Sequence, residues 1–144
     1  MISAGSDMKL LSIQNLCIEL KSNLQKKVIL DNISFNLDQG EVVGVVGESG
    51  SGKTITALSV LKLLPQNMEV TNGAIHYTGK NGQTDLLQLG SSGIRKIRGS
   101  SISMIFQEPM TSLNPVHTCG HQVREAIQLH TSLSNKETKE QLII

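Results

Sequence analysis

Residues Gly47 to Thr54 read Gly-Glu-Ser-Gly-Ser-Gly-Lys-Thr, and their types and spacing suit the binding of phosphate groups. Glycines allow the backbone to curl so that successive N–H groups point inward at phosphate oxygens. The ammonium group of Lys53 would reach the β- and γ-phosphates of a nucleotide, and the hydroxyl of Thr54 would be a ligand of Mg²⁺. The candidate phosphate-binding residues, together called the phosphate loop, are Gly47, Glu48, Ser49, Gly50, Ser51, Gly52, Lys53 and Thr54.

Two predicted elements flank the phosphate loop and must position it. The segment from Val42 to Val46 holds four valines around Gly44 without polar alternation, which predicts a strand covered on both faces at the centre of a sheet. From Lys53 onward, apolar residues recur at three- and four-residue spacing until Pro65, which predicts a helix that ends there. The N-terminus of this helix adds a partial positive charge beside the loop. The order strand, loop, helix is the context in which this motif binds phosphate.

Other segments predict a sheet in the N-terminal part and helices in the C-terminal part. Alternation of apolar and polar residues predicts antiparallel strands at Leu16–Leu20 and Ile33–Leu37, with a turn at Asp38–Gly40 after the second strand. The remaining predicted elements are a strand at Gly73–Thr78, a turn at Gly79–Gly82, a short helix at Ser91–Arg98, a mostly buried strand at Ile102–Phe106 and a helix at Val123–Leu129.

The C-terminal part contains a second kind of signal. Ser134 and Glu137 form a capping box, in which Ser134 is the N-cap of a further helix. We therefore expect a helical subdomain to begin in residues 108–144, while residues 1–8 are expected to be flexible.

Composition narrows the function classes. A chain of 144 residues suits one domain, here residues 9–144. Lys and Arg number 13 against 12 Asp and Glu, so the charge of +1 argues against nucleic acid as a partner. The N-terminus has no export signal, which predicts a cytoplasmic protein. Cys17 and Cys119 lie far apart without a metal-binding pattern, so both are expected to be reduced.

Two blocks of this sequence resemble an ATP-binding subunit of an ABC transporter. The first is Gly40–Thr54, and the second is Ile102–Pro115, which reads Ile-Ser-Met-Ile-Phe-Gln-Glu-Pro-Met-Thr-Ser-Leu-Asn-Pro. The second block is typical of the oligopeptide, dipeptide and nickel importer branch. The resemblance covers nearly the whole chain after about residue 9. It implies an α/β phosphate-loop NTPase fold with a core sheet, an antiparallel β subdomain and the start of a helical subdomain, the core sheet being incomplete in these residues.

The resemblance also implies site residues, cofactors and partners. Gln107 matches the family's Q-loop, whose amide approaches Mg²⁺ and the attacking water. Leu20 occupies the position at which the family usually stacks an aromatic ring on adenine. The implied cofactors are ATP and Mg²⁺. The implied partners are a second ATPase subunit, in a homo- or heterodimer, and membrane permease subunits that contact the region after Gln107, which places the protein on the cytoplasmic face of the cell membrane.

Hydrolysis in this family needs further motifs, namely a strand ending in Asp-Glu, a Leu-Ser-Gly-Gly-Gln signature loop and a switch histidine. None of these is found in the 144 residues. Leu89–Gly93 resembles the signature loop but precedes the Q-loop and lacks the final Gln, so we assign it to the start of a helix. We therefore expect weak nucleotide binding and no hydrolysis by this chain alone.

Two other hypotheses remain open from the sequence. The first is a truncated or decayed module that binds nucleotide or a partner without turnover. The second is a small kinase or GTPase, which would need a specificity motif such as Asn-Lys-x-Asp that this sequence does not contain. The four histidines, His76, His117, His121 and His130, are interpreted as solvated or structural rather than metal-binding.

Overall fold

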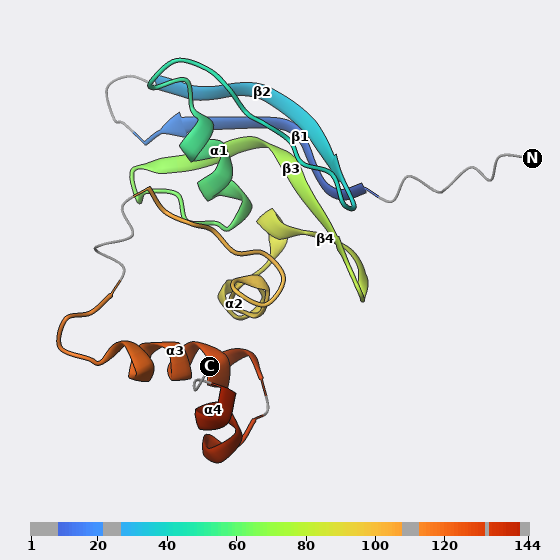
Figure 1. Ribbon diagram of the computed structural model, residues 1–144. Coiled ribbons are helices and arrows are strands. Elements are labelled where there is room, and N and C mark those ends of the chain that lie inside the picture. The colour runs from blue at the N-terminus through green and yellow to red at the C-terminus, as the bar shows by residue number, and fades with distance from the viewer. Residues whose placement is uncertain (1–8, 22–26, 108–112, 132, 142–144) are drawn as a thin grey trace, which may run out of the picture. The chain divides into compact units, whose positions relative to one another are not determined.

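The computed structural model describes residues 9–21, 27–107, 113–131 and 133–141 (Figure 1). The chain divides into two compact units, Met1–Arg95 and Lys96–Ile144, and each is described by itself. Residues 1–8, which are expected to be flexible, and residues 108–112, 132 and 142–144 of the expected helical subdomain lie outside the described residues.

The first unit is built on an antiparallel sheet with strand order β2-β1-β3-β4. The strands are β1 (Lys9–Leu20), β2 (Lys27–Asp38), β3 (Met68–Gly79) and β4 (Gly82–Asp85). Antiparallel pairing of β1 with β2 confirms the prediction made from alternating residues. The predicted strand at Gly73–Thr78 is also confirmed, as the second half of the longer β3. The turn after β2 is closed by a hydrogen bond from Glu41 N to Asp38 O of 3.1 Å.

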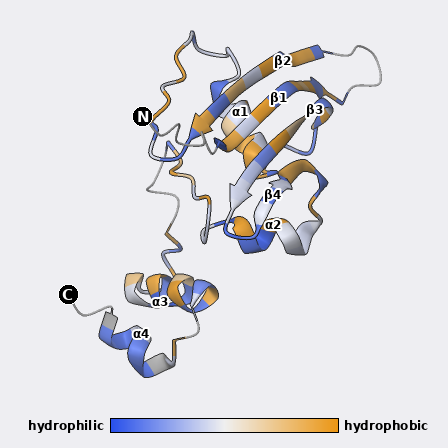
Figure 2. Cartoon of the chain, turned by 90° about the vertical axis from the view of Figure 1, so that its right-hand side faces the viewer, coloured by the Kyte–Doolittle hydropathy of each residue, from blue (hydrophilic) through white to orange (hydrophobic). Residues whose placement is uncertain are grey.

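The core of the first unit lies on the sheet face that also carries α1 (Figure 1). Figure 2 shows hydrophobic residues along β1, β2 and β3. The residues that contribute fully buried apolar side chains are Ile13, Leu16, Ile18, Ile75 and Leu86. Ile18 lies between Leu30 of β2 and Val70 of β3 in the sheet register, so the central strand is covered by a neighbour on each side.

Helix α1 (Lys53–Val60) follows the phosphate loop, as predicted, but it ends at Val60 rather than near Pro65. Lys62 adopts a left-handed conformation with φ of 51°, and its N–H donates to Ser59 O while Leu63 N donates to Leu58 O. These two bonds form a Schellman motif, which closes the helix before proline is reached. The buried face of α1 also differs from the apolar stripe, because Thr56, Ser59 and Val60 are buried.

Two predicted buried strands are wrong. Residues 42–46 and 103–106 form no strand in the structure, and Ile102 makes only an isolated bridge to Arg98. Val42 is 94% exposed, Val46 is 93% exposed and Ile105 is 95% exposed. Apolar composition favours a strand, but a strand exists only where a neighbour supplies hydrogen bonds and covers the side chains. Within the described residues, no strand of the sheet is paired with either segment.

Short elements follow β3, and the last of them, α2, extends past the end of the first unit at Arg95. The hairpin between β3 and β4 pairs Gly79 with Gly82, which confirms the predicted turn. After β4 come the 3₁₀ helix η1 (Leu86–Gln88) and helix α2 (Ser91–Ile97), which confirms the short helix predicted there. Asp85 is the N-cap of η1 and accepts a hydrogen bond from Leu87 N at 3.0 Å.

The second unit contains helices α3 (Cys119–His130) and α4 (Asn135–Gln141). Helix α3 includes the predicted Val123–Leu129 and starts earlier, because Thr118 caps it by accepting from His121 N. The capping box of α4 is confirmed. Ser134 N and Ser134 Oγ donate to Glu137 Oε2 at 2.8 and 2.6 Å, and these bonds hold the pKa of Glu137 below its ordinary value of 4.5. Cys17 is partly buried and Cys119 is exposed, and neither forms a disulfide in the structure.

Candidate phosphate-binding site

The phosphate loop folds back on its own lysine. Lys53 Nζ donates to the carbonyl oxygens of Gly47 and Glu48 at 2.7 Å each, and to Ser51 Oγ at 3.3 Å. The ammonium group therefore holds both ends of the loop together. Its three donors sit where the sequence pattern requires a positive charge beside phosphate oxygens.

At two glycines of the loop, an added Cβ would meet a close neighbour. Gly52 is the N-cap of α1 with φ of 91°, and a Cβ there would overlap with Leu30 Cδ2. A Cβ on Gly47 would lie 2.7 Å from Ser51 Oγ. Gly50 also has a positive φ, of 83°, but no atom lies within 4 Å of its missing side chain. The loop is thus packed against β2 at Gly52 and open at Gly50.

A small cavity of about 140 Å³ lies at the loop, lined by residues 50–55 and by Ile29 of β2. The first helical hydrogen bond of α1 runs from Thr56 N to Gly52 O at 2.9 Å, so the N–H groups of Lys53, Thr54 and Ile55 have no partner inside the helix. These donors, the helix dipole and the lysine together fit an anionic phosphate group. Ile29 was missed by sequence reasoning because it precedes the motif by many residues and carries no chemical signal of its own.

Thr54 is the residue of this site that could hold a metal ion. It lies in the first turn of α1 and is exposed, and its hydroxyl oxygen is a hard ligand of the kind that Mg²⁺ prefers. Among the described residues, no group of three or more His, Cys, Asp and Glu side chains could hold a metal ion.

Leu20 lies outside the cavity. It is the last residue of β1, is partly buried, and lies opposite Lys27 of β2 and Met68 of β3 in the sheet register. Ile29, rather than Leu20, is the apolar side chain that lines the cavity of the phosphate loop. The role of Leu20 at adenine stays a prediction.

Gln107 belongs to the second unit, where it is exposed and lies in a bend. The loop described after it, from Leu113, is fixed by the side chain of Gln122, which bonds to Asn114 N, Asn114 O and His117 O at 2.9 to 3.0 Å. The rings of His117 and His121 stack with centroids 5.1 Å apart. The role of Gln107 at Mg²⁺ and water stays a prediction.

The fold and the site together define the α/β class of phosphate-loop nucleotide-binding domains. The sequence profile of the ABC transporter family matches residues 30–143. The chain belongs to this family.

Relatives with assigned names are similar over most of this chain. A probable peptide ABC transporter ATP-binding protein, y4tR of Sinorhizobium fredii, is 46% identical over 79% of this chain and 33% of its own length. The peptidoglycan transport ATP-binding protein YejF of Agrobacterium fabrum is 44% identical over 93% of this chain and 24% of its own length. A putative peptide import ATP-binding protein of Brucella ovis is 39% identical over 96% of this chain and 41% of its own length. The chain thus covers between about a quarter and two-fifths of the length of these relatives.

Solved structures show the same fold. The ATP-binding cassette MJ0796, in a dimeric post-hydrolysis state bound to ADP and Pi, matches 92% of this chain and 54% of its own length with a TM-score of 0.74 and 23% identity. A second dimeric structure of MJ0796 matches with a TM-score of 0.73. The predicted fold class is confirmed by this likeness. None of the helices in the described part of the chain has the length and apolar character needed to cross a membrane.

Proposed function

We propose that this chain carries the phosphate-gripping part of an ATP-binding subunit that energises the import of peptides or a related small solute. The observation that carries the proposal is the phosphate loop, in which Lys53 and the free N–H groups of the first turn of α1 surround one small cavity. The names of the similar proteins support peptides as the solute class.

ATP is the proposed ligand, and each residue of the loop has a physical role. Lys53 exchanges its two carbonyl partners for phosphate oxygens when nucleotide binds, which replaces neutral acceptors by charged ones. The backbone of residues 50–55 supplies further donors, and Thr54 supplies a ligand for the metal. Mg²⁺, when bound, neutralises charge on the phosphates. Ile29 and Leu20 are the apolar side chains proposed to border the nucleotide beyond its phosphates.

The remaining roles are proposed for the second unit and for other chains. Gln107 positions Mg²⁺ and water, and the region after it contacts membrane permease subunits on the cytoplasmic face of the membrane. A second ATPase subunit supplies the signature loop that completes each ATP site. Because no Asp-Glu pair is present in these 144 residues, we propose that this chain alone binds nucleotide without hydrolysing it.

The test is the binding of a fluorescent ATP analogue to the purified chain with Mg²⁺, with phosphate release measured in parallel. Lys53→Ala is expected to weaken binding by about tenfold or more, since charge-assisted hydrogen bonds contribute roughly 1.5–3 kcal/mol. The matched control is Lys80→Ala, which removes an exposed lysine in the turn between β3 and β4.

The outcomes separate the hypotheses. Saturable binding that needs Lys53 but not Lys80, without phosphate release, supports the proposal. Phosphate release that depends on Lys53 would show a catalytic carboxylate within this chain and would refute the claim of binding without turnover. Equal binding by both variants would mean that the loop is not the nucleotide site.

A further inference from the structure

Strand β3 has an edge that its neighbour covers only in part. Strand β4 pairs with β3 from His76 to Gly79 and no further. The pairing stops at Asp85, whose Oδ1 accepts from Ile75 N at 3.4 Å and from Leu87 N at 3.0 Å, so that the chain turns into η1. Along residues 68–73, no strand of the described chain lies beside the outer edge of β3.

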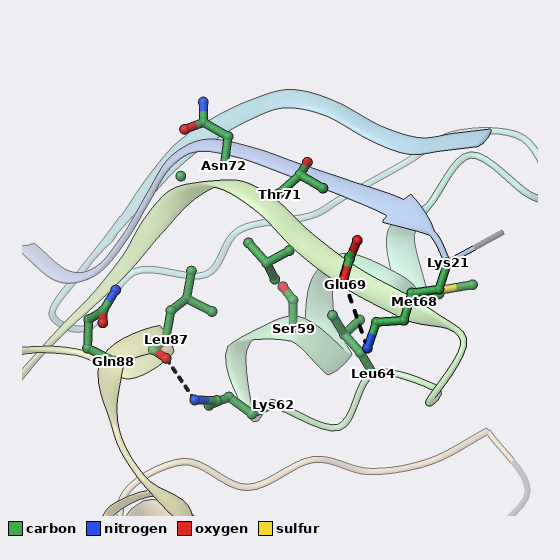
Figure 3. Close-up of a pocket in the computed structure, with 12 residues that line it drawn as sticks. Lys21, Ser59, Lys62, Leu64, Met68, Glu69, Thr71, Asn72, Leu87 and Gln88 are labelled. Atoms are coloured by element: carbon green, nitrogen blue, oxygen red, sulfur yellow. Dashed lines mark hydrogen bonds and ion pairs between the residues drawn. The ribbon is translucent and has the colours of Figure 1, made fainter. Parts of the chain in front are cut away.

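A cavity of about 600 Å³ opens beside this uncovered edge (Figure 3). We call it the β3 groove, and it is lined by residues 68–73 of β3, by Leu87 and Gln88 of η1, by Lys21 at the end of the sheet and by Ser59, Lys62 and Leu64 from α1 and the turn after it. Its volume falls within the roughly 300–1,000 Å³ of ligand sites. It is separate from the cavity at the phosphate loop, which has no lining residue in common with it.

The walls of the β3 groove are fixed by hydrogen bonds. Lys62 Nζ donates to Leu87 O at 2.7 Å and to Leu89 O at 2.8 Å, so the end of α1 is joined to η1 across the bottom of the groove. Figure 3 shows the first of these bonds, with Ser59 on the α1 side of the groove. Ser59 is fully buried, and its hydroxyl donates to Thr56 O at 2.6 Å. The groove is thus a preformed space between a strand edge and a helix.

We propose that the β3 groove binds an extended peptide segment of another protein, which adds a strand to β3 and places an acidic side chain near Lys21. An open strand edge presents alternating N–H and C=O groups, and an extended backbone is the chemistry that satisfies such a row. Six residues of strand span roughly 20 Å, so the occupant is a short segment. This function goes beyond nucleotide binding and is independent of it.

The lining of the β3 groove supports this occupant. Alternate side chains of an added strand would meet apolar surface at Leu64 and Val70 and amide groups at Asn72 and Gln88. The charged residues of the lining are Lys21, Lys62 and Glu69, which gives two positive groups and one negative group. Lys21 and Glu69 form an ion pair at the limit of 4.0 Å with both side chains 52% exposed, and such a pair is weak. A carboxylate on the peptide is therefore favoured over an ammonium group.

The experiment uses the whole chain and synthetic fluorescein-labelled hexapeptides of alternating valine and threonine with one central residue, either glutamate or lysine. Fluorescence anisotropy measures their affinity. We expect the glutamate peptide to bind saturably and about fivefold to tenfold more tightly than the lysine peptide. Lys21→Glu should reverse this preference, whereas Lys27→Glu, which changes an exposed lysine of β2 at the same end of the sheet, should preserve it.

Strand addition itself is tested from the peptide side, which avoids any risk of unfolding the protein. N-methylation of alternate residues removes the donors along one edge of the peptide. We expect one methylated set to abolish binding and the complementary set to leave it unchanged. We also expect hydrogen exchange to slow within residues 68–73 of β3 when the peptide binds. Equal binding by both methylated sets, protection on β2 instead of β3, or protection that grows with protein concentration in the absence of peptide would each overturn the proposal.

Discussion

Two apolar segments of this protein have similar composition, but one is buried and the other is exposed. Strand β1 carries Leu16 and Ile18, which are fully buried in the sheet that β1 forms with β2 and β3. The run from Val42 to Val46 is as apolar, yet the side chains at its two ends are more than 90% exposed. The difference is the presence of hydrogen-bonded neighbours, since β1 pairs with β2 along one edge and with β3 along the other. Apolar composition thus specifies which segments can be buried, and pairing decides which of them are.

The largest expected effect comes from deleting a buried side chain of β1. Ile18→Ala should lower the free energy of unfolding by about 2–5 kcal/mol, because it leaves a cavity in the core beside β2 and β3. Val46→Ala is the matched change in the exposed run and should alter stability by no more than about 0.5 kcal/mol. Urea unfolding of both variants checks this. Similar losses of unfolding free energy in the two variants would show that residues 42–46 are packed in solution, so the two segments would not differ in burial.

The phosphate loop offers a second comparison, between its packed and its open glycine. Gly52→Ala should destabilise by about 2–4 kcal/mol, because the left-handed conformation costs roughly 1–2 kcal/mol and the overlap with Leu30 adds a similar amount. Gly50→Ala has only the conformational cost, about 1–2 kcal/mol. Thermal unfolding and binding of the ATP analogue would be measured together. If Gly50→Ala lowered stability more than Gly52→Ala, the loop would not pack against β2 at Gly52 as the structure shows.

The exposed apolar segments should govern self-association rather than stability. Val46→Lys and Ile105→Lys place charges at side chains that are more than 90% exposed, so unfolding should change by about 0.5 kcal/mol or less. Static light scattering at increasing protein concentration should show less association in the double variant, since exposed apolar segments are sites of association. A cooperative loss of structure in the double variant would instead mean that these side chains are buried.

The smallest expected effect concerns the cap of α4, because its residues Ser134 and Glu137 are exposed, unlike the buried residues of the sheet. The hydroxyl and N–H of Ser134 hold the pKa of Glu137 below its ordinary value of 4.5. A carboxylate with a lowered pKa in the folded state stabilises that state above pH 4.5, and this contribution is lost as the pH falls through the lowered pKa. NMR titration of Glu137 and hydrogen exchange in α4 should therefore change together in acid. In Glu137→Gln the change with pH in the protection of α4 amides, relative to their intrinsic exchange rates, should disappear; if it persisted unchanged, another group would be responsible.

Much of the fold follows from local pattern. The alternation at Leu16–Leu20 and Ile33–Leu37 located β1 and β2, and the capping box at Ser134 located α4, because each depends on residues close in sequence. The end of α1 could not be predicted from the local pattern. Pro65 was the clear stop signal in the sequence, whereas the Schellman motif at Lys62 has no glycine to mark it. The strands predicted at Val42–Val46 and Ile102–Phe106 failed because their existence depends on neighbours that the local pattern does not contain.

The sequence by itself predicted the phosphate loop, because glycine, lysine and threonine at fixed spacing suit the chemistry of phosphate and can be recognised without a fold. Only the tertiary structure decided that Ile29 borders that loop, that Gly52 must be small because Leu30 lies against it, and that the edge of β3 opens into a groove. These features join residues far apart in the chain, and their contacts arise from strand register and packing, which are properties of the folded chain rather than of any short segment.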